Sequence, residues 1–250
     1  MTSAGLDHDQ DAAADDRSAA LSAALAQVQL SGAIFLHGEC TEAWAYESLP
    51  SHDIAALLAP DAPRMVIFHL VVSGSCWVDA GSHKVWAGAG DVIVLPYNDQ
   101  HRMGGHDPAE VVPIAQLISP PPWNGVPRVV HGLGGQRSEF VCGFLVCDDQ
   151  LFDPRLAVFP PVFVVTAPEG PLRSWVRASS DLALQQTSQV NDDRLATPTD
   201  LPALLLREVL KLHLANAPAT ETGWLAALRD PVVSPAIAAI ACMSDRRTAR

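Results

Sequence analysis

The sequence lacks the features that direct a chain into or across a membrane. No apolar run approaches the roughly 20 residues that a transmembrane helix needs. The N-terminal segment from Met1 to Asp7 has neither the basic start nor the apolar core of a signal peptide. The sequence therefore predicts a protein of the cytoplasm.

Basic charge is also scarce. Only 16 lysines and arginines stand against 28 aspartates and glutamates, which gives a formal net charge of -12. The basic residues are scattered, apart from Arg246, Arg247 and Arg250 near the C-terminus. Because binding to nucleic-acid phosphates needs a basic face, we expect no DNA-binding residues in this chain.

Several kinds of reactive group are missing as well. The five cysteines are odd in number and unclustered, which predicts reduced thiols rather than a disulfide framework. The chain contains no Gly-x-Ser-x-Gly nucleophile motif, no phosphate-binding loop and no dinucleotide fingerprint. The common catalytic motifs thus give no indication of an enzyme.

The chain does have the apolar content of a globular protein, in segments of different character. Residues 1–20 are acidic and alanine-rich, which predicts disorder, and Leu21, Leu25 and Val28 then recur at helical spacing. From Ser31 to about Thr166, short apolar runs alternate with turn residues, the pattern of a many-stranded β domain. The predicted strands are 32–37, 44–49, 65–72, 75–79, 84–86, 91–95, 111–117, 139–146 and 162–165.

After Pro171 the pattern becomes helical. One helix is predicted to begin at Leu172, and a second after Asp200, an N-cap candidate ahead of Pro202. The apolar face of the second helix, up to about Leu214, is broader than packing on one barrel requires. We therefore expect this helix to pair with a second copy of the chain.

One stretch carries the strongest local signal. Gly90 begins an apolar run, Pro96 ends it, and a tight turn leads to His101. Small double-stranded β-barrels use such a turn to aim a side chain into the barrel mouth. The stretch resembles the second signature of the cupin superfamily, Gly-x5-Pro-x-Gly-x2-His, with Asn98 where the family has glycine. Asparagine tolerates the left-handed turn conformation, so the departure is mild.

Six segments follow one another in a recognisable order. They are Phe68-His69-Leu70-Val71, Gly74-x-Cys76-Trp77, Gly90 to His101, Val141-Cys142-Gly143-Phe144, Leu201-Pro202-x-Leu204-Leu205 and Gly223-Trp224-Leu225-x-x-Leu228-Arg229-Asp230-Pro231. This order is similar to the cupin-type sensor half of AraC-type transcription regulators, over roughly residues 20 to 240. The resemblance implies a mainly β fold with α-helices: a cupin-like double-stranded β-barrel that senses a ligand (21–170), then a helical dimerisation region (171–222).

In that family the Gly-Trp-Leu segment runs into the first helix of a DNA-binding domain with two helix-turn-helix units. Here the sequence from Ala241 to Arg250 does not resemble the continuation and is too short for one such unit. We therefore expect residues 223–250 to be a remnant of that domain, left by truncation or a frameshift, with DNA binding lost.

The candidate ligand-binding residues are His69, Trp77, His101 and Cys142. His101 either faces a pocket or is satisfied at the barrel rim. Trp77 alternates with Cys76, so one of the two faces inward, and a tryptophan there would wall a pocket or pack in the core. His69 shares a strand face with Ile67.

A metal site has a weaker basis. Counting back from Gly74, Ile67 stands where the first cupin signature has its glutamate, so the usual metal cage is missing. His69, Cys76, His101 and Cys142 would form an unusual His2Cys2 cluster, for which zinc is the expected ion. Separate placement of these residues in the core is the alternative.

These observations favour a non-enzymatic sensor whose effector is a small apolar or aromatic molecule, working as a homodimer or as a heterodimer with full-length relatives. A metal-dependent cupin enzyme, a dioxygenase or isomerase, is the alternative. It is disfavoured by the broken first signature and by the lack of an acid/base pair. A third hypothesis is an interaction module that pairs with full-length relatives and blocks them.

Overall fold

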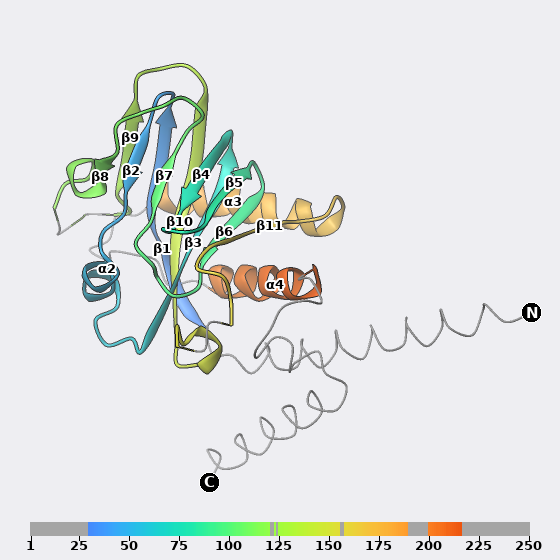
Figure 1. Ribbon diagram of the computed structural model, residues 1–250. Helices are drawn as coiled ribbons and strands as arrows, with labels where there is room; N and C mark the ends of the chain where they lie inside the picture. Colours follow the sequence, from blue (N-terminus) through green and yellow to red (C-terminus); the bar gives the residue numbers. More distant parts are fainter. Residues whose placement is uncertain (1–29, 121–122, 124, 156–157, 190–199, 217–250) are drawn as a thin grey trace, which may run out of the picture. The chain divides into compact units, whose positions relative to one another are not determined.

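The computed structural model describes residues 30–120, 123, 125–155, 158–189 and 200–216 (Figure 1). The predicted disorder before residue 21, the helix predicted from Leu21 and the predicted remnant at 223–250 all lie outside these residues. Contacts divide the chain into two compact units, residues 30–206 and residues 1–29 with 207–250. Of the second unit, the described part is the end of one helix.

The fold is mainly β, and its strands form two mixed sheets. The larger sheet has the order β11 (Phe163–Thr166), β6 (Asp91–Leu95), β3 (Arg64–Ser73), β10 (Arg137–Cys147), β1 (Ser31–Thr41) and β9 (Arg128–Gly132). The smaller sheet has the order β5 (Lys84–Gly88), β4 (Ser75–Asp79), β7 (Arg102–Gly104), β2 (Ala45–Glu47) and β8 (Val112–Pro113). Neighbouring strands are antiparallel, except that β9 is parallel to β1 and β8 to β2.

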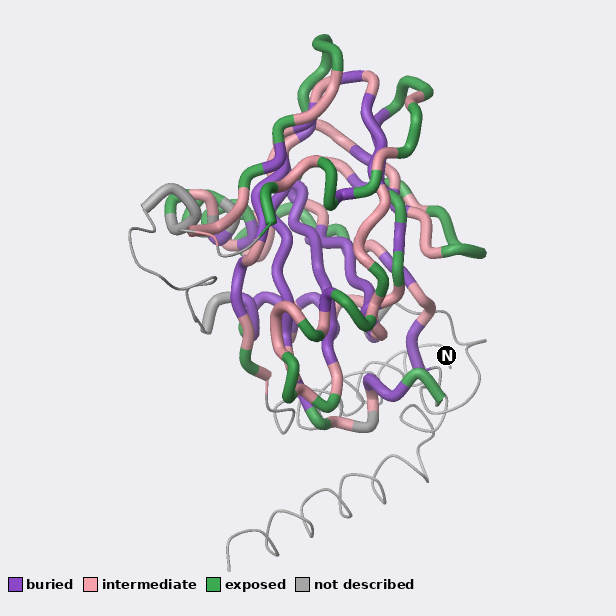
Figure 2. The backbone as a smooth tube through the Cα atoms, turned by 90° about the vertical axis from the view of Figure 1, so that its left-hand side faces the viewer, coloured by how far each residue is buried: buried purple, intermediate pink, exposed green. Residues whose placement is uncertain are grey.

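The main core lies between the two sheets. Leu36, Ile67 and Phe140 from the larger sheet pack in one cluster with Tyr46 and Met103 from the smaller sheet. Figure 2 shows the buried residues along the central strands and the exposed ones at the turns. Among the described strands no pairing joins one sheet to the other, so the closed barrel that the sequence predicted is here two facing sheets.

Three glycines in these sheets each lie directly opposite an aromatic residue on the neighbouring strand. The pairs are Gly38 with Phe140, Gly104 with Trp77 and Gly143 with Phe68. A Cβ atom built on these glycines would lie 2.3, 2.4 and 2.1 Å from the opposing ring, respectively. Each ring therefore occupies the space that a side chain at the glycine would need.

The helices are α2 (Ser51–Leu58), α3 (Pro171–Gln189) and α4 (Asp200–Asn216), and two short 3₁₀ turns span Ile114–Gln116 and Gln150–Phe152. α2 links β2 of the smaller sheet to β3 of the larger one. α3 contacts β1, β3 and β10 of the larger sheet. None of the described helices is long and apolar enough to cross a membrane.

Most described apolar side chains of α4 are buried. Leu205 and Val209 are buried, and Leu204 is the exposed apolar side chain of the helix's described residues. The pairing of this helix with a second copy of the chain stays a prediction.

Candidate functional site

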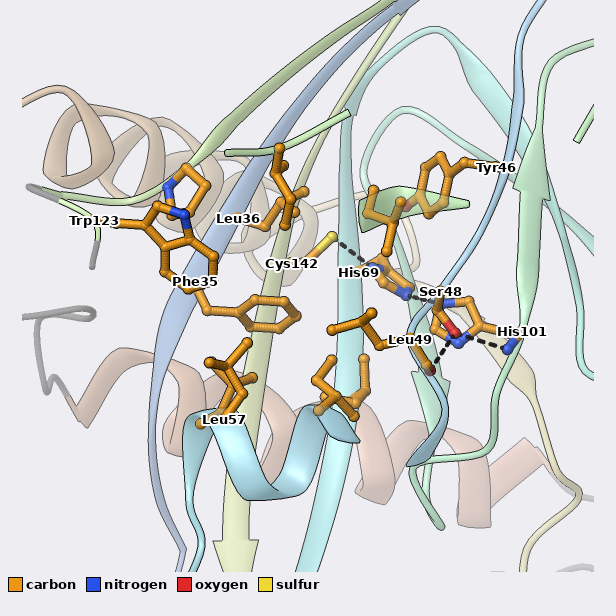
Figure 3. Close-up of a pocket in the computed structure, with 16 residues that line it drawn as sticks. Phe35, Leu36, Tyr46, Ser48, Leu49, Leu57, His69, His101, Trp123 and Cys142 are labelled. Carbon is orange, nitrogen blue, oxygen red and sulfur yellow. Dashed lines mark hydrogen bonds between the residues drawn. The ribbon is translucent and has the colours of Figure 1, made fainter. Parts of the chain in front are cut away.

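An apolar pocket lies between the two sheets (Figure 3). Phe35 and Leu36 of β1 line it from the larger sheet, and the α2 residues Ile54, Leu57 and Leu58 also line it. Its polar residues are Tyr46, Ser48, His69, His101, Trp123 and Cys142, and no charged side chain is among the lining residues. The cavity has a volume of about 50 Å³.

Two neighbouring strands and one turn supply the polar residues at the centre of the pocket. Cys142 of β10 is directly opposite His69 of β3, so the two side chains share a face of the larger sheet. The turn after β6 delivers His101. In this turn Asn98 has a φ of 56°, as the sequence predicted for the family's glycine position, and its side-chain amide donates to the Ser51 carbonyl at the start of α2.

Cys142, His69 and His101 form a hydrogen-bonded row, called the His69 row below. Dashed lines in Figure 3 mark its hydrogen bonds. Cys142 Sγ is 2.8 Å from His69 Nδ1, and His69 Nε2 is 3.0 Å from His101 Nε2. His101 Nδ1 is in turn 3.0 Å from the backbone carbonyl oxygen of Asp99. The structure thus brings together three of the four predicted site residues, His69, His101 and Cys142.

Burial keeps these groups uncharged near neutral pH. Loss of hydration lowers the pKa of His101 from 6.5 to about 4. It also lowers the pKa of His69 well below 6.5, with a further contribution from His101. Burial raises the pKa of the Cys142 thiol and that of the Tyr46 hydroxyl well above their usual values. The row therefore consists of two neutral imidazoles and a thiol.

The row does not have the geometry of the predicted zinc cluster. His69 presents opposite ring nitrogens to Cys142 and to His101, so the three side chains do not converge on one point as metal ligands must. Cys76 is buried on β4.

In a second group of potential metal ligands, basic residues already neutralise the negative charge. In the described part of the chain, three ligand atoms of His37, Glu39 and Glu139 lie within 4.8 Å of one another. Arg128 and Arg137 form ion pairs with Glu39, and Arg137 also pairs with Glu139. We interpret this group as an ion-pair network across β9, β1 and β10.

The structure places Trp77 outside the pocket, contrary to the sequence-based hypothesis. Of the alternating pair on β4, Cys76 is fully buried and Trp77 is partly exposed. The Lys84 ammonium lies 4.0 Å from the centre of the Trp77 ring, and the ring covers Gly104 of the next strand. Cys76 is therefore the residue of the pair that faces inward, and Trp77 packs on the opposite face of the smaller sheet.

Sequence reasoning missed the α2 side of the pocket. Ile54, Leu57 and Leu58 have the i, i+3, i+4 spacing of an apolar helix face, and they follow Pro50. These signals could have identified the helix. Trp123 also went unrecognised, because it follows a proline-rich connection that carries no periodic pattern.

The two sheets and the apolar pocket belong to one mainly β domain. The chain belongs to the cupin family: a family model described as cupin matches residues 19–215. Over 187 residues it is 29% identical to an AraC-like transcription regulator from Streptomyces lividans. The matched stretch covers 71% of this chain and 57% of that protein. These findings support a cupin domain of AraC-type regulators, which here spans little more than half the length of that relative.

A solved structure gives a weaker likeness. The protein YhaK from Escherichia coli is 10% identical, with a TM-score of 0.29 over 57% of this chain and 44% of that one. A score of this size does not establish a common fold.

Proposed function

We propose that this chain is the small-molecule-sensing domain of an AraC-type transcription regulator and is not an enzyme. The observation that carries the proposal is the apolar pocket between the sheets, lined by α2 and by the His69 row. Small-molecule sites are typically concave and mainly apolar, with a few placed polar groups. An apolar or aromatic effector fits this lining.

The state of the polar groups supports a sensor over a catalyst. A general acid or base works best when its pKa lies near the operating pH. Burial instead moves the pKa of His69 downward and that of Cys142 upward, away from neutrality. Both groups are also engaged in internal hydrogen bonds, so neither is poised to exchange a proton with a substrate.

The size of the cavity suggests how a ligand would be reported. An apolar cavity of about 150 Å³ binds benzene, whereas this one has about 50 Å³. A ring-sized effector would therefore have to move part of the lining outward. Because α2 joins β2 of one sheet to β3 of the other, its displacement would change how the two sheets are connected.

DNA would be recognised by a partner of this chain. With a net charge of -12, this chain is unsuited to holding phosphates. It would act on DNA through a full-length relative with which it pairs, and hence in the cytoplasm, where a transcription regulator works.

A thermal-shift screen of small apolar and aromatic compounds tests the proposal. A compound that stabilises the wild type should fail to stabilise Leu58→Trp, because the larger side chain fills the pocket. It should still stabilise the matched control Leu133→Trp, since Leu133 is 89% exposed. Equal stabilisation of Leu58→Trp would contradict the assigned pocket. About one iron or manganese per chain together with oxygen uptake would favour the dioxygenase alternative.

A further inference from the structure

We propose that the pocket selects uncharged ligands and excludes anions, and that His101 is the residue that determines this selectivity. The inference rests on the proposed sensing function and specifies the chemistry of its effector. It follows from the direction of each hydrogen bond in the His69 row.

The direction can be derived from one end of the row. The Asp99 carbonyl can only accept, so His101 Nδ1 must carry the proton in that bond. In a neutral imidazole His101 Nε2 is then an acceptor, and His69 Nε2 must donate to it. His69 Nδ1 is consequently an acceptor, and the Cys142 thiol donates to it.

Every proton in the row is therefore engaged in a hydrogen bond to the next group. The neutral state that this order requires agrees with the lowered pKa of both histidines and with the raised pKa of Cys142. Neither imidazole has an N–H left for a ligand.

The other polar side chains of the lining also donate their hydrogen bonds to groups of the protein. The Tyr46 hydroxyl donates to Met103 Sδ at 2.9 Å, and the Ser48 hydroxyl donates to the Leu49 carbonyl at 3.1 Å. The Trp123 indole N–H donates to the Ser119 carbonyl at 2.6 Å. The lining side chains thus offer a ligand lone pairs on oxygen and sulfur, but no free donor and no positive charge.

This inventory decides which ligands fit. A hydroxyl or N–H group on the ligand can donate to the lone pairs of Tyr46 or Cys142. A carboxylate would give up its hydration and gain no donor, and an uncompensated buried charge is strongly unfavourable. We expect an anion to bind at least about 100-fold more weakly than a neutral molecule of the same shape.

Benzene, phenol and benzoate test this, because they share a ring and differ in the polar group. Binding is followed at pH 7 by NMR of ¹³C-labelled isoleucine methyl groups. The lining contains Ile54, Ile67, Ile114 and Ile118. Ile34 and Ile93, which are buried but do not line the pocket, are the internal controls.

Shifts of the lining methyls with benzene and phenol, and none with benzoate at 100-fold higher concentration, are the expected result. Benzoate binding as tightly as phenol at the same methyls would overturn the anion exclusion while leaving the sensing pocket intact. If none of the three shifts these methyls, the proposed function fails, and this inference fails with it.

Variants of His101 test its role separately. Replacing His101 with Leu removes the acceptor of the His69 Nε2–H bond, which frees one donor in the pocket. We expect His101→Leu to bind benzoate within about tenfold of phenol. His101→Met keeps a sulfur atom as a weak acceptor and adds no donor, so it should go on rejecting benzoate. His101→Ala removes the same acceptor and is the second variant if His101→Leu does not fold. Either variant, once folded, overturns the assignment to His101 if it rejects benzoate as the wild type does.

Discussion

The bond between Cys142 and His69 gives a prediction whose size can be derived from the structure. Replacing Cys142 with Ala leaves His69 Nδ1, in a side chain 2% exposed, without a donor. An unsatisfied buried group costs about 1–3 kcal/mol, and the lost burial of the sulfur adds about 1 kcal/mol. We expect Cys142→Ala to reduce the free energy of unfolding by about 2–4 kcal/mol. At about 2–4 °C per kcal/mol for a domain of this size, Tm should fall by about 4–16 °C.

A double-mutant cycle separates the hydrogen bond from the packing. In a His69→Leu background the acceptor of the Cys142 thiol proton is already gone, so Cys142→Ala should cost only the packing contribution of about 1 kcal/mol. The coupling between the two positions is then about 1–3 kcal/mol. Cys142→Ser is the matched control, because its hydroxyl can still donate to His69.

Urea unfolding with an unchanged m value is the appropriate measurement. The reasoning is refuted if Cys142→Ala costs the same in both backgrounds, since that would mean the thiol contributes only its volume.

Three further predictions test other parts of the structure. Burial lowers the pKa of His101 from 6.5 to about 4, so between these pH values the unfolded chain binds a proton that the folded chain does not. The free energy of unfolding should therefore fall as the pH decreases, by about 3 kcal/mol at most from this residue. The urea midpoint of His101→Gln should decline less over the same pH range. Gly143→Ala places a Cβ 2.1 Å from the Phe68 ring and should cost about 1–3 kcal/mol in thermal unfolding, whereas Gly88→Ala, with no atom nearer than 3.8 Å, should leave Tm nearly unchanged. The purified chain should give no sequence-specific gel shift with duplex DNA at physiological salt, because its net charge is -12; a specific shift at nanomolar protein would contradict this.

Much of the β framework could be predicted because turn residues and apolar runs are local signals. The predicted strands 75–79 and 91–95 coincide with β4 and β6. The run 111–117 was predicted as one strand, but the structure has the two-residue β8 followed by a 3₁₀ turn. The short strand β7 and the edge strand β9 were missed. Their pairing depends on partners far away in the sequence, such as β1 for β9.

The polar centre of the site was predictable as a set of residues but not as a geometry. His101 follows from the turn motif, and His69 and Cys142 from the segments shared with AraC-type regulators. That the two lie directly opposite each other depends on the register of β3 with β10, which no local pattern specifies. Strand alternation indicated that either Cys76 or Trp77 faces inward, and only the packing of Trp77 on Gly104 shows which.

The three pairs of a glycine opposite a ring have a consequence for how such chains can change over time. Each glycine is acceptable because the facing ring covers it, and each ring has room because the glycine lacks a Cβ. A larger residue at Gly143 becomes tolerable only after Phe68 has become smaller. Replacing the ring first leaves a cavity, whereas replacing the glycine first produces a clash. Among related sequences, these pairs should therefore vary together, with loss of the aromatic residue coming before loss of the glycine.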